Sequence, residues 1–371
     1  MKETDSANTA DRPVSLNPEP RMPKSKHFGI GIVGAGGIVN YAHLPAYRTA
    51  GFNIVGITDM QRQKAEQTAH EHKIPKVYTG LSELLKDPSV DIVDVAVYPQ
   101  DQLGVAEQVT AAGKHLLCQK PLSDEYASAV RIVQLARNAG VKLAVNQQMR
   151  WSPGIRCARQ LLERGWVGAP CYGTIQVHVF TDWSLWPWMY NGKRLEILFH
   201  SIHHIDSLRY LLGMPRRVYS TGWHSPDEKT EAETKTLSVW EYDGPLRVLV
   251  DINHGVRQDD RYAIFRVEGT SGIVKGTIGL LYNYPTGRPD TLEAMSEHIK
   301  PGEWVNPQFT RLWIPDAFVG PMASLMCAIE EDGEPETSGE DNLKTLQLVF
   351  AAYRSMTEKR AVHPEEIAGD E

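Results

Sequence analysis

The sequence predicts an α/β protein of two domains, a doubly wound parallel sheet followed by an α/β domain with a large, mostly antiparallel open sheet. Three observations lead to this prediction. The 371 residues are too many for one ordinary core. Short apolar runs alternate with helical patterns up to about residue 147, which is typical of a parallel sheet. Beyond that point polar and apolar residues alternate, which is typical of strands with one covered face.

The first predicted strand, 27–33, is a short apolar run that leads into a glycine-rich turn. Gly34 permits a tight turn, and Gly36 leaves room for a pyrophosphate beside the backbone. A helical pattern follows, and the N–H groups at its start can bind phosphate oxygens. Val39 stands where the G-x-G-x-x-G motif has its third glycine. The turn predicts a Rossmann dinucleotide site that includes Gly34, Gly36, Gly37 and Ile38.

The second predicted strand, 53–58, ends in Asp59. An acidic residue about 20 positions after the glycines, at the tip of this strand, binds the ribose hydroxyls of a dinucleotide. The same carboxylate repels a 2′-phosphate, so the sequence favours NAD over NADP. Arg62 lies close enough to weaken this preference, and it is included among the expected cofactor contacts.

The alternation continues with strands at 90–97, 115–118 and 142–145 and with helices at 62–72, 82–86, 102–112 and 123–138. Ser82 is expected to cap the second of these helices at its start. Ligands of such sheets lie beyond the carboxyl ends of the strands. Tyr98, Pro99, Gln119 and Lys120 are therefore expected to face the cofactor. Lys120 stands between a strand and a proline, which would hold a charge rigidly at the nicotinamide end; a solvated loop lysine is the alternative.

Composition narrows the class of protein. The net charge of −7 argues against nucleic acid as a partner, and the apolar runs are too short to span a membrane. The four cysteines lack the paired spacing of a zinc site or a disulfide framework, which favours a cytoplasmic protein. Residues 1–26 contain four prolines among polar residues and no secretory signal, so they are expected to be a disordered leader, and 363–371 a polar tail.

Taken together, these motifs resemble the glucose–fructose oxidoreductase/inositol dehydrogenase/MocA (Gfo/Idh/MocA) family. The resemblance rests on GIVGAGGI at 31–38, AGKHLLCQKPL at 112–122, Asn146 and Arg150, and on 57–59, 165–168, 203–206, 209–213, 338–341 and 351–355. It implies a Rossmann domain over 27–147 and a substrate and oligomerisation domain over 148–362. It also implies a nicotinamide cofactor, a homo-oligomer, and oxidation of a hydroxyl of a sugar, polyol or glycoside to a carbonyl.

The chemical centre of the second domain is a predicted helix over 196–212, set among strands at 171–180, 217–222, 234–242, 246–253 and 262–268. By the resemblance, His203 matches the family's catalytic histidine and Lys120 its catalytic or nicotinamide-adjacent lysine. Our hypothesis is that His203 removes the hydroxyl proton while Lys120 polarises the oxygen. Asp206, one helical turn after His203, would orient the histidine or bind a substrate hydroxyl.

Three positions depart from the family pattern. Phe199 stands where the family often has an acidic residue, Gln119 where it has glutamate, and Leu103 where it has histidine. The proton relay would then run through His200, His204 or the substrate itself. A metal is not expected, because the neighbouring histidines and Asp206 cannot all point one way along a helix.

An aromatic segment, 181–188, contains three tryptophans, whose faces can pack on the C–H faces of a sugar. Packing against a neighbouring subunit is the alternative. Arg150 and Trp151 lie just past the last Rossmann strand, where the two domains should meet. The predicted substrate contacts are Arg150, Trp151, Asp182, Trp183, His200, His204 and Asp206.

These features predict an NAD-dependent oxidoreductase acting on a carbohydrate-like small molecule. Two other functions stay open. One is a redox-neutral enzyme that cleaves a glycoside with tightly held NAD, which Phe199 and the aromatic segment make harder to dismiss. The other is a non-catalytic NAD-binding regulator, against which the presence of Lys120 and His203 argues.

Overall fold

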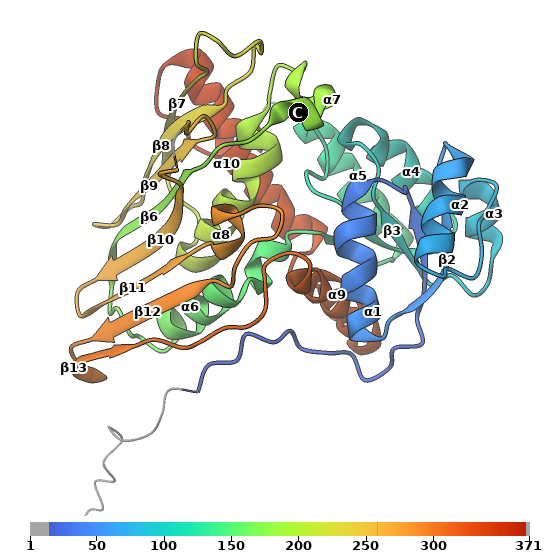
Figure 1. Cartoon of the computed structure of the whole chain (residues 1–371), viewed down its shortest axis with the longest axis horizontal. Helices are drawn as coiled ribbons and strands as arrows, with labels where there is room; N and C mark the ends of the chain where they lie inside the picture. Colours follow the sequence, from blue (N-terminus) through green and yellow to red (C-terminus); the bar gives the residue numbers. More distant parts are fainter. Residues whose placement is uncertain (1–14, 258, 369–371) are drawn as a thin grey trace, which may run out of the picture.

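The protein, described by a computed structural model at residues 15–257 and 259–368, contains two sheets with helices between them (Figure 1). The first sheet has five parallel strands, and the second has eight strands in mostly antiparallel order. The fold class predicted from the sequence is confirmed.

The parallel sheet has the order β2-β1-β3-β4-β5. Its strands are β1 (Gly29–Val33), β2 (Asn53–Thr58), β3 (Ile92–Val95), β4 (His115–Cys118) and β5 (Leu143–Val145). A single parallel bridge between Ile57 and Val77 extends the sheet beyond β2. This bridge takes the place of the third Rossmann strand. The chain reverses direction across the sheet between β1 and β3, and dinucleotides bind at such a switch point.

Helices follow the strands as the alternation predicts. They are α1 (Leu44–Ala50), α2 (Arg62–Glu71), α3 (Leu81–Lys86), α4 (Pro99–Ala111) and α5 (Tyr126–Ala139), with a π turn, η2 (Val39–His43), before α1. Gly140 ends α5 in the left-handed conformation. The prediction that Ser82 caps α3 is wrong, because Gly80 is the N-cap and Ser82 lies inside the helix.

The second sheet has the order β13-β12-β11-β10-β6-β9-β8-β7. Its strands are β6 (Pro170–His178), β7 (Arg217–Trp223), β8 (Lys235–Glu241), β9 (Arg247–Asn253), β10 (Tyr262–Gly269), β11 (Gly272–Thr277), β12 (Thr291–Ser296) and β13 (Lys300–Val305). The five predicted strands are present, whereas β11, β12 and β13 were not predicted. Helices α6 (Pro153–Glu163), α8 (Ile202–Leu212) and α10 (Gly339–Glu358) cover the face toward the first domain (Figure 1).

The opposite face of this sheet carries exposed apolar side chains, and no helix lies over it in Figure 1. These side chains are Tyr219, Trp223, Leu237, Val239 and Trp304.

Helix α9 (Val319–Glu331) packs on the first domain, although it comes late in the sequence. It contacts α1 and β5. Its residues Met322, Leu325 and Met326 are fully buried in one apolar cluster with Ile30 and Ile32 of β1. The core of the Rossmann domain is therefore completed by residues far beyond the predicted border at 147.

Residues 15–26 lie along α6 and α9, in contrast to the disordered leader that the sequence predicts. Arg164 donates to the Ser15 carbonyl at 2.8 Å, and the Ser25 amide donates to Glu330 at 2.6 Å. These contacts pair backbone groups that the composition predicted to be exposed to solvent. Residues 1–14 of the leader lie outside the described residues, as do 369–371 of the predicted tail, whose residues Glu365–Ala368 form a short helix, α11. None of the helices in the described ranges is long and apolar enough to cross a membrane.

Candidate active site

The glycine-rich turn lies at the carboxyl end of β1. Gly34 has a φ of 108°, and a Cβ there would meet the Ala96 carbonyl oxygen at 2.4 Å, so only glycine fits. A Cβ on Gly36 or Gly37 would meet no atom within 4 Å. The chain is therefore tight at Gly34 and open at the next two glycines, where Ile38 begins the following helical turn. This open side has room for the pyrophosphate of a dinucleotide.

Asp59 lies against this turn. Its Oδ2 accepts a hydrogen bond from the Ala35 amide at 2.8 Å, and its Oδ1 accepts one from the Gln61 amide at 2.7 Å. The carboxylate thus joins the ends of β1 and β2, as the strand-end rule predicts. Arg62 donates to Glu66 on its own helix at 2.7 Å, and both side chains are largely exposed.

The turn after β4 is fixed by buried amides. Gln102 donates to the carbonyls of Gln119 and Pro121 at 2.8 and 2.7 Å. Gln119 accepts from the Lys120 amide through Oε1 at 2.8 Å, so its Nε2 is the atom 3.2 Å from His43 Nε2. Sequence reasoning did not identify Gln102 or His43, because both act from the interiors of helical segments.

His43 belongs to a buried polar network behind the strand ends. Its Nδ1 lies 2.7 Å from Asp94 of β3, and Tyr47 donates to the same carboxylate at 2.9 Å. Asn146 places its amide nitrogen 3.2 Å from His43 Nε2, and its Oδ1 is buried without a partner within the described chain. Gln147 likewise has both amide atoms buried and unpartnered there. These free amide atoms, close to the strand ends, fit the polar edge of a bound nicotinamide nucleotide.

Lys120 reaches from the first domain into the second. Its Nζ donates to the Phe199 carbonyl at 2.6 Å. Burial lowers the pKa of Lys120 to about 8. A lysine in this state exchanges a proton near physiological pH, as an acid–base group requires.

The acceptor carbonyl lies in a π turn, η5 (Ile197–Ser201), that leads directly into α8. The sequence predicts one regular helix over 196–212, so this turn is a correction. π turns shift the helical hydrogen bonding by one residue and often occur at functional sites. The turn brings the Phe199 backbone, in place of a side-chain carboxylate, to the Lys120 ammonium.

His203 lies in the first turn of α8 and is buried. Its ring meets Trp313 edge-on at 5.1 Å, and its Nδ1 is buried without a partner among the described residues. Burial, together with the nearby Lys120 charge, lowers the pKa of His203 well below its ordinary value. His203 is therefore a neutral imidazole that can accept a proton. Trp313 was not identified from the sequence.

Two further histidines lie beside His203 in the sequence, His204 in α8 and His200 in η5. Burial also lowers the pKa of His204 to about 4, although Glu196 opposes the shift. The ring of His200 lies 5.1 Å from that of His254, which follows β9. Sequence reasoning missed Glu196 and His254, since only the fold brings them beside these rings.

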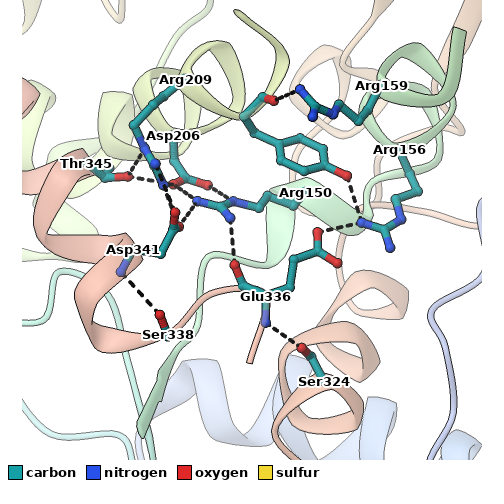
Figure 2. Close-up of polar contacts among 11 residues, drawn as sticks. Arg150, Arg156, Arg159, Asp206, Arg209, Ser324, Glu336, Ser338, Asp341 and Thr345 are labelled. Carbon is teal, nitrogen blue, oxygen red and sulfur yellow. Dashed lines mark hydrogen bonds and ion pairs between the residues drawn. The ribbon is translucent and has the colours of Figure 1, made fainter. Parts of the chain in front are cut away.

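Arg150 and Asp206 bind each other rather than Lys120 or His203 (Figure 2). Arg150 donates to both Asp206 oxygens at 2.7 and 2.6 Å and to the Glu336 carbonyl at 2.9 Å. Thr345 also donates to Asp206 at 2.6 Å, and Arg209 and Asp341 complete the network. Among the described residues, no hydrogen bond or ion pair joins Asp206 to His203, and both Asp206 oxygens accept from Arg150. The roles of Arg150 and Asp206 as substrate contacts stay predictions. Trp151 packs against Gly320 of α9 in the same region.

The aromatic segment lies over the start of η5. The ring of Trp188 packs on Tyr98 at 4.6 Å and on Phe199 at 5.2 Å, so it joins the two domains. The ring of Trp183 meets His200 at 4.8 Å. Asp182 and Trp183 also line an adjoining cavity of about 430 Å³. Pro99 is the first residue of α4, directly after Tyr98.

No group of three or more His, Cys, Asp or Glu side chains is arranged to hold a metal ion in the part of the chain that the structure describes.

Comparison with known proteins agrees with this geometry. Residues 28–147 match the oxidoreductase family with NAD-binding Rossmann fold, and residues 155–275 match the GFO/IDH/MocA C-terminal domain. The chain is 26% identical over 342 residues to D-apiose dehydrogenase of Paraburkholderia graminis, covering 91% of this chain and 90% of the relative. It is 27% identical over 344 residues to 1,5-anhydro-D-fructose reductase of Ensifer adhaerens, covering 90% and 98%.

Solved structures share the whole fold. An oxidoreductase from Agrobacterium radiobacter in complex with NAD+, L-tartaric acid and magnesium superposes with a TM-score of 0.81 at 24% identity, covering 92% of this chain and 99% of that one. Levoglucosan dehydrogenase in complex with NADH and levoglucosan gives 0.77 at 18% identity, covering 91% and 99%. With its glycine turn, its two sheets and both domain matches, the chain belongs to the Gfo/Idh/MocA family of oxidoreductases.

Proposed function

We propose that this protein is an NAD-dependent dehydrogenase that oxidises a hydroxyl of a sugar, polyol or glycoside to a carbonyl. The observation that carries the proposal is the Lys120 ammonium held 2.6 Å from the Phe199 carbonyl, in the turn that leads into His203. A titratable lysine and a neutral histidine thus meet at the carboxyl edge of the parallel sheet, where a dinucleotide ends. The names of the relatives, among them a D-apiose dehydrogenase, support the substrate class.

Each residue has a defined part in this proposal. When bound, the nicotinamide supplies the hydride acceptor. Lys120 donates a hydrogen bond to the substrate oxygen and stabilises the charge that develops there. His203, neutral because it is buried beside Lys120, accepts the hydroxyl proton, so that an O–H bond breaks and an N–H bond forms. Trp183 and His200 lie beside this position and would contact the remaining hydroxyls and C–H faces.

NAD is preferred to NADP in this proposal. Asp59 presents a carboxylate at the ribose position, where a 2′-phosphate would meet like charge. Arg62 already pairs with Glu66 on α2. The expected result is a lower KM for NAD than for NADP, measured with one substrate under identical conditions.

The test is absorbance at 340 nm with NAD or NADP and a panel of sugars, polyols, sugar acids and glycosides, for wild type and His203→Ala. Reduction of the nucleotide that disappears in the variant supports the proposal. A wild type that binds NAD yet reduces none of it argues against a dehydrogenase. Cleavage of a glycoside by that same sample would then favour the redox-neutral reaction, and binding without turnover would favour a regulator.

The exposed apolar face of the second sheet supports a homo-oligomer. Light scattering on the purified protein would show a mass above the monomer's 41.5 kDa. The cytoplasmic location stays a prediction.

A further inference from the structure

Glu196, the residue before the π turn η5, is a fully buried carboxylate. Oε1 accepts from Ser201 across the turn, and Oε2 accepts from Thr236 of β8 at 2.7 Å. Within residues 15–257 and 259–368, no lysine or arginine pairs with it. A buried carboxylate that lacks a cation costs several kcal/mol, so its presence beside the candidate active site requires an explanation.

His254 lies within ion-pair range of Glu196. Its Nε2 is 3.7 Å from Glu196 Oε1, within ion-pair range and slightly longer than a hydrogen bond. Its Nδ1 is 2.7 Å from the Thr181 hydroxyl. His254 and Thr181 also line the cavity of about 430 Å³, so the imidazole connects the buried carboxylate with that cavity.

His200 stands three residues before His203, where η5 leads into α8, and its ring faces that of His254. The rings of His254 and His200 lie 5.1 Å apart, and Trp183 packs on both, at 5.2 and 4.8 Å. The buried nitrogens His200 Nδ1 and His254 Nε2 have no hydrogen-bond partner in the described chain. In the described part of the chain, the ionisable groups around the pair are His200, His204, Lys120, Glu233 and Tyr353, and those that line the cavity with His254 are Asp182, Tyr190, Asp227, Glu228 and Arg257.

Proton release is the step that needs such a group. If His203 takes the proton of the substrate hydroxyl, it becomes an imidazolium in the field of the Lys120 ammonium, and this field opposes its charge. Phe199, one turn earlier, contributes no carboxylate to offset it. Glu196 is a buried carboxylate within ion-pair range of His254.

We propose that Glu196 and His254 form a proton-accepting pair that draws the substrate's proton away from His203. This inference rests on the proposed dehydrogenase function. The proton leaves His203 for His200 and then His254, one N–H bond breaking as the next forms, and no electrons move. Glu196 stabilises the His254 imidazolium, and the proton then passes from His254 to solvent in the cavity. Glu196 touches no substrate in this scheme, so it is a positioning residue.

The experiment compares E196Q with E233Q. Glutamine keeps the size of Glu196, and the Ser201 and Thr236 hydroxyls can turn to suit an amide. Glu233 is the matched control, because it is another buried carboxylate at the same turn. It accepts from the Ile197 amide at 3.0 Å and from Tyr353 at 2.6 Å, and no histidine bonds it within the described residues.

In E196Q, kcat for alcohol oxidation should fall about 10- to 100-fold with a changed pH profile and a larger solvent isotope effect. KM for NAD should stay within about twofold, and E196D, which keeps the charge, should recover part of the rate. E233Q should keep the wild-type pH profile. If E196Q and E233Q show the same rates and profiles, the proposal is overturned.

A second readout does not depend on turnover. In protein labelled with ¹⁵N-histidine, the ring signals of His254, assigned with H254Q, should differ between E196Q and wild type and stay unchanged in E233Q, because Glu196 Oε1 lies 3.7 Å from His254 Nε2. Identical His254 signals in E196Q and wild type would overturn the pair. A wild type without dehydrogenase activity would defeat the proposed function alone, since this measurement would still decide whether Glu196 and His254 are coupled.

Discussion

Burial of Lys120 lowers the stability of the fold, while its lowered pKa suits the proposed reaction. Its folded pKa of about 8 lies below that of an unfolded lysine, near 10.4, so the folded state binds fewer protons between these values. The resulting loss in the free energy of unfolding is complete below pH 8, and it disappears above the pKa of the lysine in the unfolded chain. Replacing Lys120 with methionine should therefore stabilise the fold by about 1–3 kcal/mol at pH 7 while it lowers kcat at least about 100-fold.

Urea unfolding of K120M and wild type at pH 7 and at pH 10.5 checks this prediction. The gain in the free energy of unfolding should be present at the lower pH and nearly absent at the higher one. An equal gain at both pH values would show that the fold does not disfavour the charged form of Lys120.

Gln119 lies in a network that only an amide satisfies. Its Nε2 faces His43 Nε2, and the other ring nitrogen of His43, Nδ1, contacts Asp94. In Gln119→Glu, a carboxylate replaces the amide nitrogen that faces His43, and a buried hydrogen bond is lost. The variant should lose about 1–3 kcal/mol of stability relative to wild type. Thermal unfolding at pH 7 measures this loss, with Gln119→Met as the control that adds no charge.

Individual site residues could be predicted from the sequence where one strand end fixes their position. The glycine turn, Asp59 and Lys120 follow from the rule that ligands lie at the carboxyl ends of parallel strands, and each lies there. Gln102, Glu196 and His254 could not be predicted, because their partners come from other elements of the fold. Arg150 and Asp206 lay on the expected elements but bind each other.

At the scale of elements, the aromatic segment connects the two domains above the turn η5. Trp188 packs on Tyr98 and Phe199, and each such aromatic contact contributes about 0.5–1.5 kcal/mol. Trp188→Ala should raise the KM for the sugar about tenfold and leave the affinity for NAD nearly unchanged. Steady-state kinetics with each substrate varied in turn measures both.

Leu185→Ala is the matched control for this prediction. Leu185 lies in the same segment and is 65% exposed, so its removal should change neither constant. If Leu185→Ala and Trp188→Ala raise the KM equally, the effect belongs to the mobility of the segment and not to the ring contacts.

Whole elements were predictable where the apolar pattern is regular. Strands β1 to β10 and the helices around them follow from alternation, whereas the π turn η5 keeps an apolar pattern like that of a regular helix and leaves no mark in the sequence. Strand β13 was missed because most of its side chains are exposed and it joins β12 through a register shift. Pairing with a neighbour, rather than burial, forms that strand.

At the scale of the whole molecule, the Arg150–Asp206 network ties η3 (Gln148–Trp151), α8 and α10 together (Figure 2). Removing one partner of a buried ion pair leaves an uncompensated charge and costs about 3–5 kcal/mol. We expect Asp206→Ala to lose that amount in urea unfolding. Asp243→Ala, which breaks an exposed pair with Arg216, should lose less than about 1 kcal/mol. Equal losses would contradict this role.

The same network makes the stability of the fold depend on pH. Burial alone would raise the pKa of Asp341, but Arg150 and Arg209 outweigh it and lower the pKa. Its contribution is therefore present above the unfolded pKa of an aspartate and is lost as the pH falls through the folded value.

Because α9 packs on the first domain, the two domains of this protein cannot easily be exchanged separately between related genes. Met322, Leu325 and Met326 cover apolar surface of the nucleotide-binding half from a position long after that half has ended in the sequence. A gene truncated after residue 147 would encode a nucleotide-binding domain whose apolar surface under α9 is exposed to solvent. Exchange of the substrate half between relatives therefore succeeds only if the incoming half brings a helix of the same shape, so the two halves must change together.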